Sequence, residues 1–206
     1  MNNVRKPTTL RAHIVVHDEH SLINEMKKLG IHDKEVFFKY RRGKEIFARQ
    51  IKKNRHRRTR FTPDLIETEY DMLRALYRAA PENVAAPICL VRDRDGEVIG
   101  YLVEYINGDR LSSLMLESSS RCLPMDERVE MMKEVVGIMN RLHEAGVGHG
   151  DLYYRNMLRD RKDRRVKLVD PITHPDGLGA AIKEAIRSDM ERLDGTIAYI
   201  EVFRTW

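Results

Sequence analysis

One stretch, from Gly146 to Pro171, constrains the fold of this chain more than any other feature: GVGHGDLYYRNMLRDRKDRRVKLVDP. Asp151 lies in a His-Gly-Asp sequence, Asn156 follows five residues later, and Asp170 ends the apolar run VKLV. The pattern predicts a loop that presents one carboxylate and one carboxamide, followed by a strand that delivers a second carboxylate. Oxygen ligands of this kind hold a divalent ion against phosphates, and a carboxylate beside them can orient or deprotonate a hydroxyl. The stretch therefore predicts a phosphoryl-transfer site, with an ordinary turn between two core elements as the alternative.

The composition is that of a globular chain. Its 206 residues are 42% hydrophobic and 33% charged, which is enough for one large domain or two small lobes. No apolar run approaches the ~20 residues of a membrane span, and the N-terminal stretch lacks the apolar core of a secretory signal. Cys89 and Cys122 are too few for a disulfide framework, so we expect a reducing, cytoplasmic location.

The formal charge of +5 is unevenly distributed. Residues 49–60, RQIKKNRHRRTR, contain seven Lys or Arg and no acid, so the remainder of the chain has a net charge of −2. Such a run can dock a polyanion: nucleic acid, an anionic membrane surface or a phosphorylated glycan. It can equally be a solvated connector, and the residues alone leave both interpretations open.

The first half of the chain predicts strands and two helices. Ser21 is a good N-cap for a short helix that ends at Gly30, and Thr62 begins a longer helix that ends near Ala80. Apolar runs predict strands at residues 12–16, 35–40, 45–51, 86–92 and 97–106. No glycine-rich G-x-G-x-x-G phosphate loop occurs among them, so a different segment would have to cover bound phosphates.

The second half predicts helices around the central stretch. Asp126 begins a long amphipathic helix that ends at Gly146 and runs directly into the loop of Asp151. We assign its methionines to the core. A last helix is expected at about residues 178–193, and with the strands of the first half this gives an α+β fold.

The set H-G-D-L-x-x-x-N, followed by a strand that ends in Asp, resembles the catalytic loop and metal-binding aspartate of the protein-kinase-like superfamily. The resemblance implies a bilobal fold. Its N-lobe, a small antiparallel sheet with a helix, would occupy residues 1–106, and a minimal, mostly helical C-lobe residues 107–206. H-G-D-L with a short downstream segment is similar to atypical members such as RIO-type kinases and bacterial lipopolysaccharide-core heptose kinases. The phrases EYINGDRL and KEAIRSDMERL resemble the latter group.

The same resemblance implies ATP and Mg2+ as cofactors and gives roles to the residues of the stretch. Asp151 would position or deprotonate the acceptor hydroxyl, while Asn156 and Asp170 would chelate the metal. His149 is expected to brace the loop rather than do chemistry. Asp189, in RSDMERLD, resembles the buried acid that holds the backbone of this loop. Gly150 stands where regulated protein kinases have arginine, so no partner for an activation-loop phosphate is expected.

Further residues are assigned only through this resemblance. Lys52 is similar to the lysine of V-A-I-K and would contact the nucleotide phosphates, held by Glu69 of the following helix, although neighbouring cations could replace it. EYINGD resembles the hinge of protein kinases. Backbone groups of Glu104 and Ile106 would then bind adenine, and Asp109 would reach the ribose.

The resemblance implies an ATP-dependent kinase that transfers the γ-phosphate to a hydroxyl acceptor. A lipopolysaccharide-core sugar or another small molecule, recruited as an anion by residues 49–60, is one candidate acceptor. A RIO-like protein Ser/Thr kinase is an alternative. A nucleotide-binding pseudokinase is another, favoured by Pro171 in place of the usual Phe-Gly but opposed by the intact acids, and a polyanion-binding module is the third.

Overall fold

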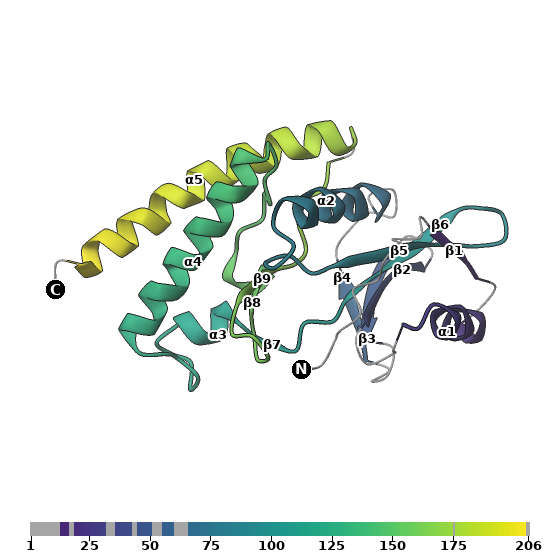
Figure 1. Cartoon of the computed structure of the whole chain (residues 1–206), viewed down its shortest axis with the longest axis horizontal. Helices are drawn as coiled ribbons and strands as arrows, with labels where there is room; N and C mark the ends of the chain where they lie inside the picture. The colour runs from purple at the N-terminus through teal and green to yellow at the C-terminus, as the bar shows by residue number, and fades with distance from the viewer. Residues whose placement is uncertain are drawn as a thin grey trace. The chain divides into compact units, whose positions relative to one another are not determined.

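The structure is a computed structural model that describes residues 13–16, 19–31, 36–42, 45–50, 55–59, 66–174 and 176–204 (Figure 1). Its elements, in chain order, are β1 (His13–Val15), α1 (Glu19–Lys28), β2 (Val36–Arg42), β3 (Glu45–Gln50), β4 (Arg55–Thr59), α2 (Ile66–Ala79), β5 (Pro87–Arg92), β6 (Val98–Glu104), β7 (Gly108–Arg110), α3 (Leu111–Met115), α4 (Met125–Glu144), the 3-10 turn η3 (Tyr154–Asn156), β8 (Met157–Asp160), β9 (Val166–Leu168) and α5 (Leu178–Arg204). Among these helices none combines the length and apolar character needed to cross a membrane. The predicted α+β class is confirmed.

The chain divides into two compact units. The first comprises Met1–Glu67 and Pro87–Tyr105, and the second comprises Thr68–Ala86 and Ile106–Trp206. The first unit contains a six-stranded sheet in the order β1-β5-β6-β2-β3-β4, and the second contains a three-stranded sheet in the order β7-β8-β9. All pairs of described strands are antiparallel except β1 with β5.

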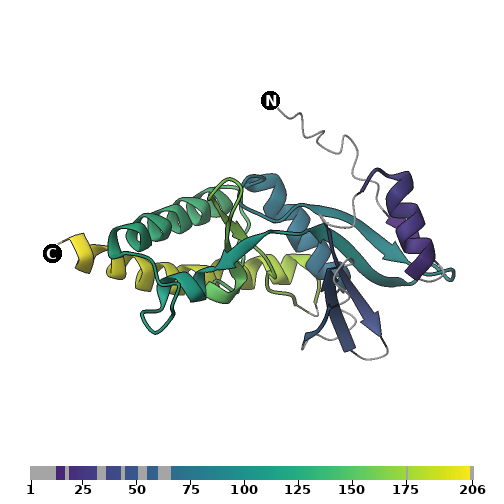
Figure 2. The ribbon, with the colours of Figure 1, turned by 90° about the horizontal axis from the view of Figure 1, so that it is seen from below.

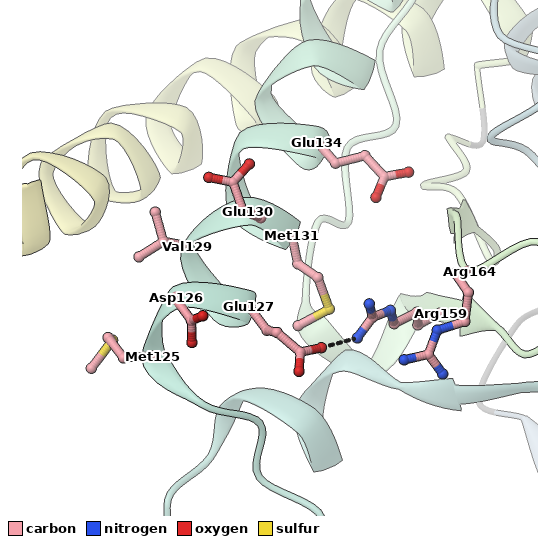
Figure 3. A pocket seen from close by; sticks show the side chains of 9 residues that line it. All are labelled: Met125, Asp126, Glu127, Val129, Glu130, Met131, Glu134, Arg159 and Arg164. Atoms are coloured by element: carbon pink, nitrogen blue, oxygen red, sulfur yellow. Dashed lines mark hydrogen bonds and ion pairs between the residues drawn. The ribbon is translucent and has the colours of Figure 1, made fainter.

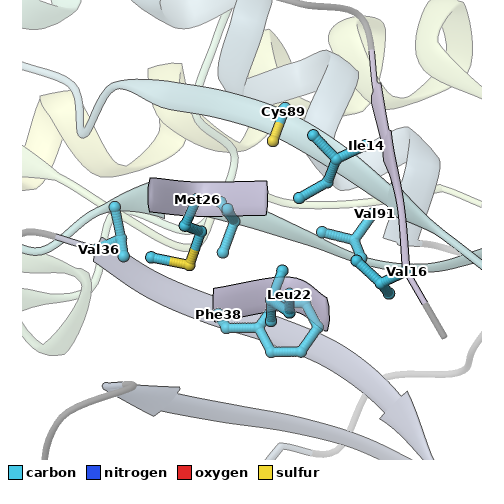
Figure 4. Close-up of a cluster of buried hydrophobic side chains, with 9 residues drawn as sticks. Ile14, Val16, Leu22, Met26, Val36, Phe38, Cys89 and Val91 are labelled. Carbon is cyan, nitrogen blue, oxygen red and sulfur yellow. The ribbon is translucent and has the colours of Figure 1, made fainter. Parts of the chain in front are cut away.

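The core of the first unit lies between α1 and its sheet (Figure 4). Leu22 and Met26, one turn apart on α1, are each 1% exposed and pack with apolar side chains of four strands. Cys89 belongs to this cluster, and its burial raises the pKa of the thiol to about 12. This cysteine is therefore an inert core residue.

In the second unit α4 and α5 lie side by side, as Figures 1 and 2 show from two directions. A polar network fixes β9 beside α4. Glu134 of α4 accepts a hydrogen bond from the Val166 amide at 2.9 Å, and Asn83 Nδ2 donates to the Val166 carbonyl at 2.9 Å. Arg141 completes the network by donating to Asn83 Oδ1 at 2.8 Å. These bonds position the strand that carries the chain to Asp170.

Most predicted elements are present, with four corrections. Ser21 is not an N-cap but lies inside α1, and α4 begins after Pro124, which leaves Asp126 in its first turn. The last helix continues through residue 195 to Arg204. Part of the basic run forms β4, which pairs with β3. Thr62 and Lys52 lie outside the described residues.

Candidate active site

The loop after α4 lies directly against the backbone of α5. Gly148 and Gly150 make this approach possible, because a Cβ atom on Gly148 would lie 2.7 Å from the Ile186 nitrogen. On Gly150 it would lie 2.7 Å from the Cβ atom of Ile172 and 2.9 Å from the Cα atom of Ala185, at a φ of +78°. No side chain fits there. The glycine in place of the arginine of regulated kinases is thus part of the packing of this loop.

Asp189 of α5 holds the backbone of the loop. Its two carboxylate oxygens accept hydrogen bonds from the His149 amide at 2.6 Å and the Gly150 amide at 2.8 Å. Ser188 adds a bond from its hydroxyl to the Gly150 carbonyl at 2.9 Å. Asp189 is fully buried, and burial raises its pKa against the lowering effect of His149 and of the amide donors. The predicted similarity of Asp189 to a buried, loop-binding acid is confirmed.

His149 braces the loop from inside. The imidazole is fully buried, and burial lowers its pKa, so the neutral ring is favoured. Nε2 lies 3.0 Å from the Val169 carbonyl, and Nδ1 accepts from the Asp151 amide at 3.3 Å, which assigns the proton to Nε2. The carboxylates of Asp151 and Asp170 both act on this pKa, so both lie within electrostatic reach of one ring.

Asn156 joins the loop to the end of β9. Its Nδ2 donates to the Asp151 carbonyl at 3.0 Å and to Asp151 Oδ2 at 2.6 Å. The Val169 amide donates to the Asn156 carbonyl at 3.0 Å, which brings the next residue, Asp170, beside this pair. Asp170 has a left-handed backbone, with φ at 55°. The structure thus brings together the three residues that the sequence singled out.

These residues fit a magnesium ion. The Asn156 side-chain NH2 group donates both of its hydrogen bonds to Asp151. The side-chain oxygen of Asn156 makes no hydrogen bond to the described residues, so it is available to a cation. An amide oxygen and one carboxylate are typical protein ligands of Mg2+, which takes its other ligands from water and phosphates. Among the described residues, no group of three or more His, Cys, Asp or Glu could hold a metal ion by itself. The donor set therefore suits Mg2+ with a nucleotide better than a closed all-protein metal cage.

A stack of two arginines on a tyrosine, not predicted from the sequence, lies beside Asp151. Arg155 Nη2 is 3.3 and 3.2 Å from the two Asp151 oxygens. The Tyr153 ring centroid is 4.0 Å from the Arg155 Cζ and 3.7 Å from the Cζ of Arg192. Both guanidinium groups therefore lie within cation–π range of the one ring. In the sequence, the i, i+4 spacing of Asp151 and Arg155 could have indicated the contact between these two side chains.

Lys39 is a second candidate for the phosphate-binding lysine, beside Lys52. Lys52 lies outside the described residues, and Glu69, 1% exposed, is on α2. Lys39 on β2 is 3% exposed, and its Nζ lies 6.0 Å from the centroid of the Tyr101 ring. A lysine is rarely buried unless a charge partner or a function keeps it there. The signal in the sequence was a single cation within the apolar strand EVFFKY.

The hinge-like segment coincides with the division of the chain. β6 ends at Glu104, and the boundary between the two units falls between Tyr105 and Ile106. Asp109 follows on β7, where its carboxylate accepts from Arg161 at 2.7 and 3.1 Å and from Arg121 at 2.9 Å. These bonds lower the pKa of Asp109. Adenine and ribose binding by this segment stays a prediction.

Comparison with known proteins identifies the class to which this site belongs. The model of the lipopolysaccharide kinase (Kdo/WaaP) family matches residues 19–171, and the chain belongs to this family. The predicted membership of the protein-kinase-like superfamily is thereby confirmed.

Two curated relatives agree with this class over shorter stretches. The KEOPS complex subunit Bud32 of Pyrococcus abyssi is 36% identical over 97 residues, which are 47% of this chain and 40% of Bud32. The probable serine/threonine-protein kinase fnkB of Dictyostelium discoideum is 32% identical over 68 residues, 33% of this chain and 12% of fnkB. Among solved structures, the granulovirus kinase PK-1 of Cydia pomonella has 19% identity and a TM-score of 0.44, covering 76% of this chain and 60% of PK-1.

Proposed function

We propose that this protein transfers the γ-phosphate of ATP to a hydroxyl group of an acceptor, with Mg2+ as the metal. The observation that carries the proposal is the orientation of Asn156. Its amide protons bind Asp151 at 3.0 and 2.6 Å, and its amide oxygen is left for a cation next to Asp170. In such a site the same few hydrogen bonds hold both the proposed general base and the proposed metal ligands.

In the proposed mechanism the chain contributes positioning and charge. Asp151 accepts the hydrogen bond of the acceptor hydroxyl and takes its proton as the acceptor oxygen bonds to the γ-phosphorus. The bond from the γ-phosphorus to the bridging oxygen breaks, and ADP leaves with that oxygen. Asn156 and Asp170 provide the oxygen ligands of Mg2+, which when bound neutralises charge on the phosphates. Asp189 and His149 keep the loop that carries Asp151 from moving, through buried hydrogen bonds on both sides of it.

We further propose Lys39 as the lysine that aligns the phosphates, in place of the initial assignment to Lys52. Its support is burial: a lysine 3% exposed retains its charge only with a compensating carboxylate or phosphate nearby. Lys52, by contrast, belongs to a run of seven cations without an acid.

The acceptor proposed here bears a negative charge close to its reactive hydroxyl. The support is the pair of guanidinium groups that stack on Tyr153 beside the proposed base. Arginine forks favour planar, bidentate binding of carboxylates and phosphates. A lipopolysaccharide-core sugar or another anionic small molecule fits this description better than a neutral peptide hydroxyl. The predicted cytoplasmic location is consistent with ATP as the donor.

Labelled ATP tests the proposal. The wild-type protein, incubated with γ-labelled ATP, Mg2+ and a fractionated extract, is expected to transfer label to a small anionic acceptor, and EDTA should remove at least about 90% of the transfer. Lys39→Met should reduce the rate by roughly 10²-fold or more, whereas Lys52→Met should stay within about threefold. Loss of transfer in Lys52→Met alone would return the role to Lys52. ATP binding without transfer to any acceptor would instead support a pseudokinase.

A further inference from the structure

A second polar cavity lies in the second unit at the turn between β8 and β9. It has a volume of about 230 Å³ and is lined by Asp109, Leu114, Arg121, Leu123, Arg159, Arg161 and Arg164. A larger groove of about 760 Å³ adjoins it along the first turns of α4. Figure 3 shows this groove, with the side chains of Arg159 and Arg164 on one side and the acidic side chains of α4 on the other. The two arginines line both spaces, so the cavity and the groove are adjacent.

The cavity has more positive charge than its own acids compensate. Four arginines line it together with one acid, Asp109, which is shared by Arg161 and Arg121. Arg159 pairs with Glu127 at 3.1 Å, but its Nε is buried and has no hydrogen-bond partner among the described residues. The guanidinium of Arg164 makes no ion pair with any residue that the structure describes. Arg159 thus has one buried donor without a partner, and the exposed Arg164 has no carboxylate beside it among the residues that the structure describes.

The backbone at Arg164 is unusual for an arginine. The turn closes through hydrogen bonds between Asp160 and residues 164 and 165, at 3.0 and 2.9 Å, and leaves Arg164 with a φ of 64°. Glycine and asparagine adopt this left-handed conformation more readily than a long side chain does. The turn itself therefore does not require an arginine at this position. We expect that glycine can replace Arg164 without loss of the fold.

We infer that this cavity binds a phosphate group, as a site separate from the catalytic loop and independent of the roles proposed there. Guanidinium groups converging from the turn and from the segment before α4 can surround a tetrahedral dianion with charge-assisted hydrogen bonds. Leu114 and Leu123 form apolar walls that limit hydration of these bonds. A phosphate ester would extend its remaining hydroxyls into the groove, where Asp126 and Glu130 can accept hydrogen bonds. A free phosphate ion would occupy the cavity alone.

Calorimetric titration of the whole protein tests the site. Inorganic phosphate and glycerol 3-phosphate are each titrated at constant ionic strength, with a saturating non-hydrolysable ATP analogue to fill the nucleotide site. Wild type should bind in the millimolar range or tighter, and Arg164→Gly should weaken binding by about tenfold or more. The matched control is Lys162→Ala, an exposed cation of the same turn that does not line the cavity, and it should stay within about twofold.

Each outcome bears on the inference. Tighter binding of glycerol 3-phosphate supports an esterified ligand, and equal binding supports free phosphate in the same site. Absence of binding, or equal weakening by both variants, would overturn the site in favour of diffuse attraction to a basic surface. Because glycine suits the turn, the melting temperature of Arg164→Gly without phosphate should not fall below that of wild type. Arg121→Ala is a second variant that should independently weaken phosphate binding.

Discussion

Asp151→Asn is expected to lower the rate of phosphoryl transfer by about 10²- to 10⁴-fold while the Kd for ATP changes by less than about threefold. The amide cannot take the acceptor proton, but it can still accept a hydrogen bond from Asn156, whose Nδ2 lies 2.6 Å from the present carboxylate oxygen. Single-turnover rates and calorimetric titration with ATP separate the two quantities.

The matched control for this variant is Asp176→Asn. The Asp176 side chain is 81% exposed and makes no short contact with the loop, so its transfer rate should match that of wild type. Transfer by Asp151→Asn within about tenfold of wild type would remove Asp151 from the role of base. A parallel loss of ATP affinity would instead show that Asp151 binds the nucleotide.

Asp189→Ala is expected to lower the free energy of unfolding by about 2–5 kcal/mol. The substitution removes the acceptor for two buried amides, those of His149 and Gly150, at 2.6 and 2.8 Å. Asp189→Asn retains one acceptor oxygen and should lie between this variant and wild type. Denaturant unfolding monitored by circular dichroism measures the difference.

The exposed Glu191 of the same helix provides the control. Its side chain is 69% exposed, and Glu191→Ala should change the unfolding free energy by less than about 0.5 kcal/mol. If Asp189→Ala behaved like Glu191→Ala, the loop would have to be held by other contacts. The account of its rigidity would then be wrong.

What could be predicted from the sequence was local in the chain. Asp151 and Asn156 are five residues apart, and Asp170 ends an apolar strand, so their juxtaposition followed from spacing and pattern. The strands 86–92 and 97–106 were found for the same reason, since apolar runs around a polar turn specify a hairpin without reference to the remainder of the chain.

What could not be predicted depends on distant partners. The bond from Asp189 to the loop amides spans about forty residues, and only a resemblance suggested it. The burial of Lys39 depends on residues such as Tyr101 in a strand far along the sequence. The ion pairs of Asp109 with Arg161 and Arg121 were not predicted either, because both arginines come from other segments and no local pattern brings them to Asp109.

Helix ends show the same limit. Ser21 has the chemistry of a cap, yet α1 begins at Glu19, because Leu22 and Met26 pack into the core and the helix extends around them. The last helix was expected at about residues 178–193, but α5 continues through Gly195 to Arg204. Packing along the length of a helix can outweigh one unfavourable residue.

The most direct test of the central claim is the magnesium dependence of ATP binding in wild type and Asp170→Ala, measured by calorimetric titration with and without Mg2+. We predict that Mg2+ tightens ATP binding by wild type about tenfold or more, and that Asp170→Ala binds ATP equally weakly under both conditions. Magnesium dependence retained in full by Asp170→Ala would contradict the proposal that Asn156 and Asp170 hold the metal beside the nucleotide.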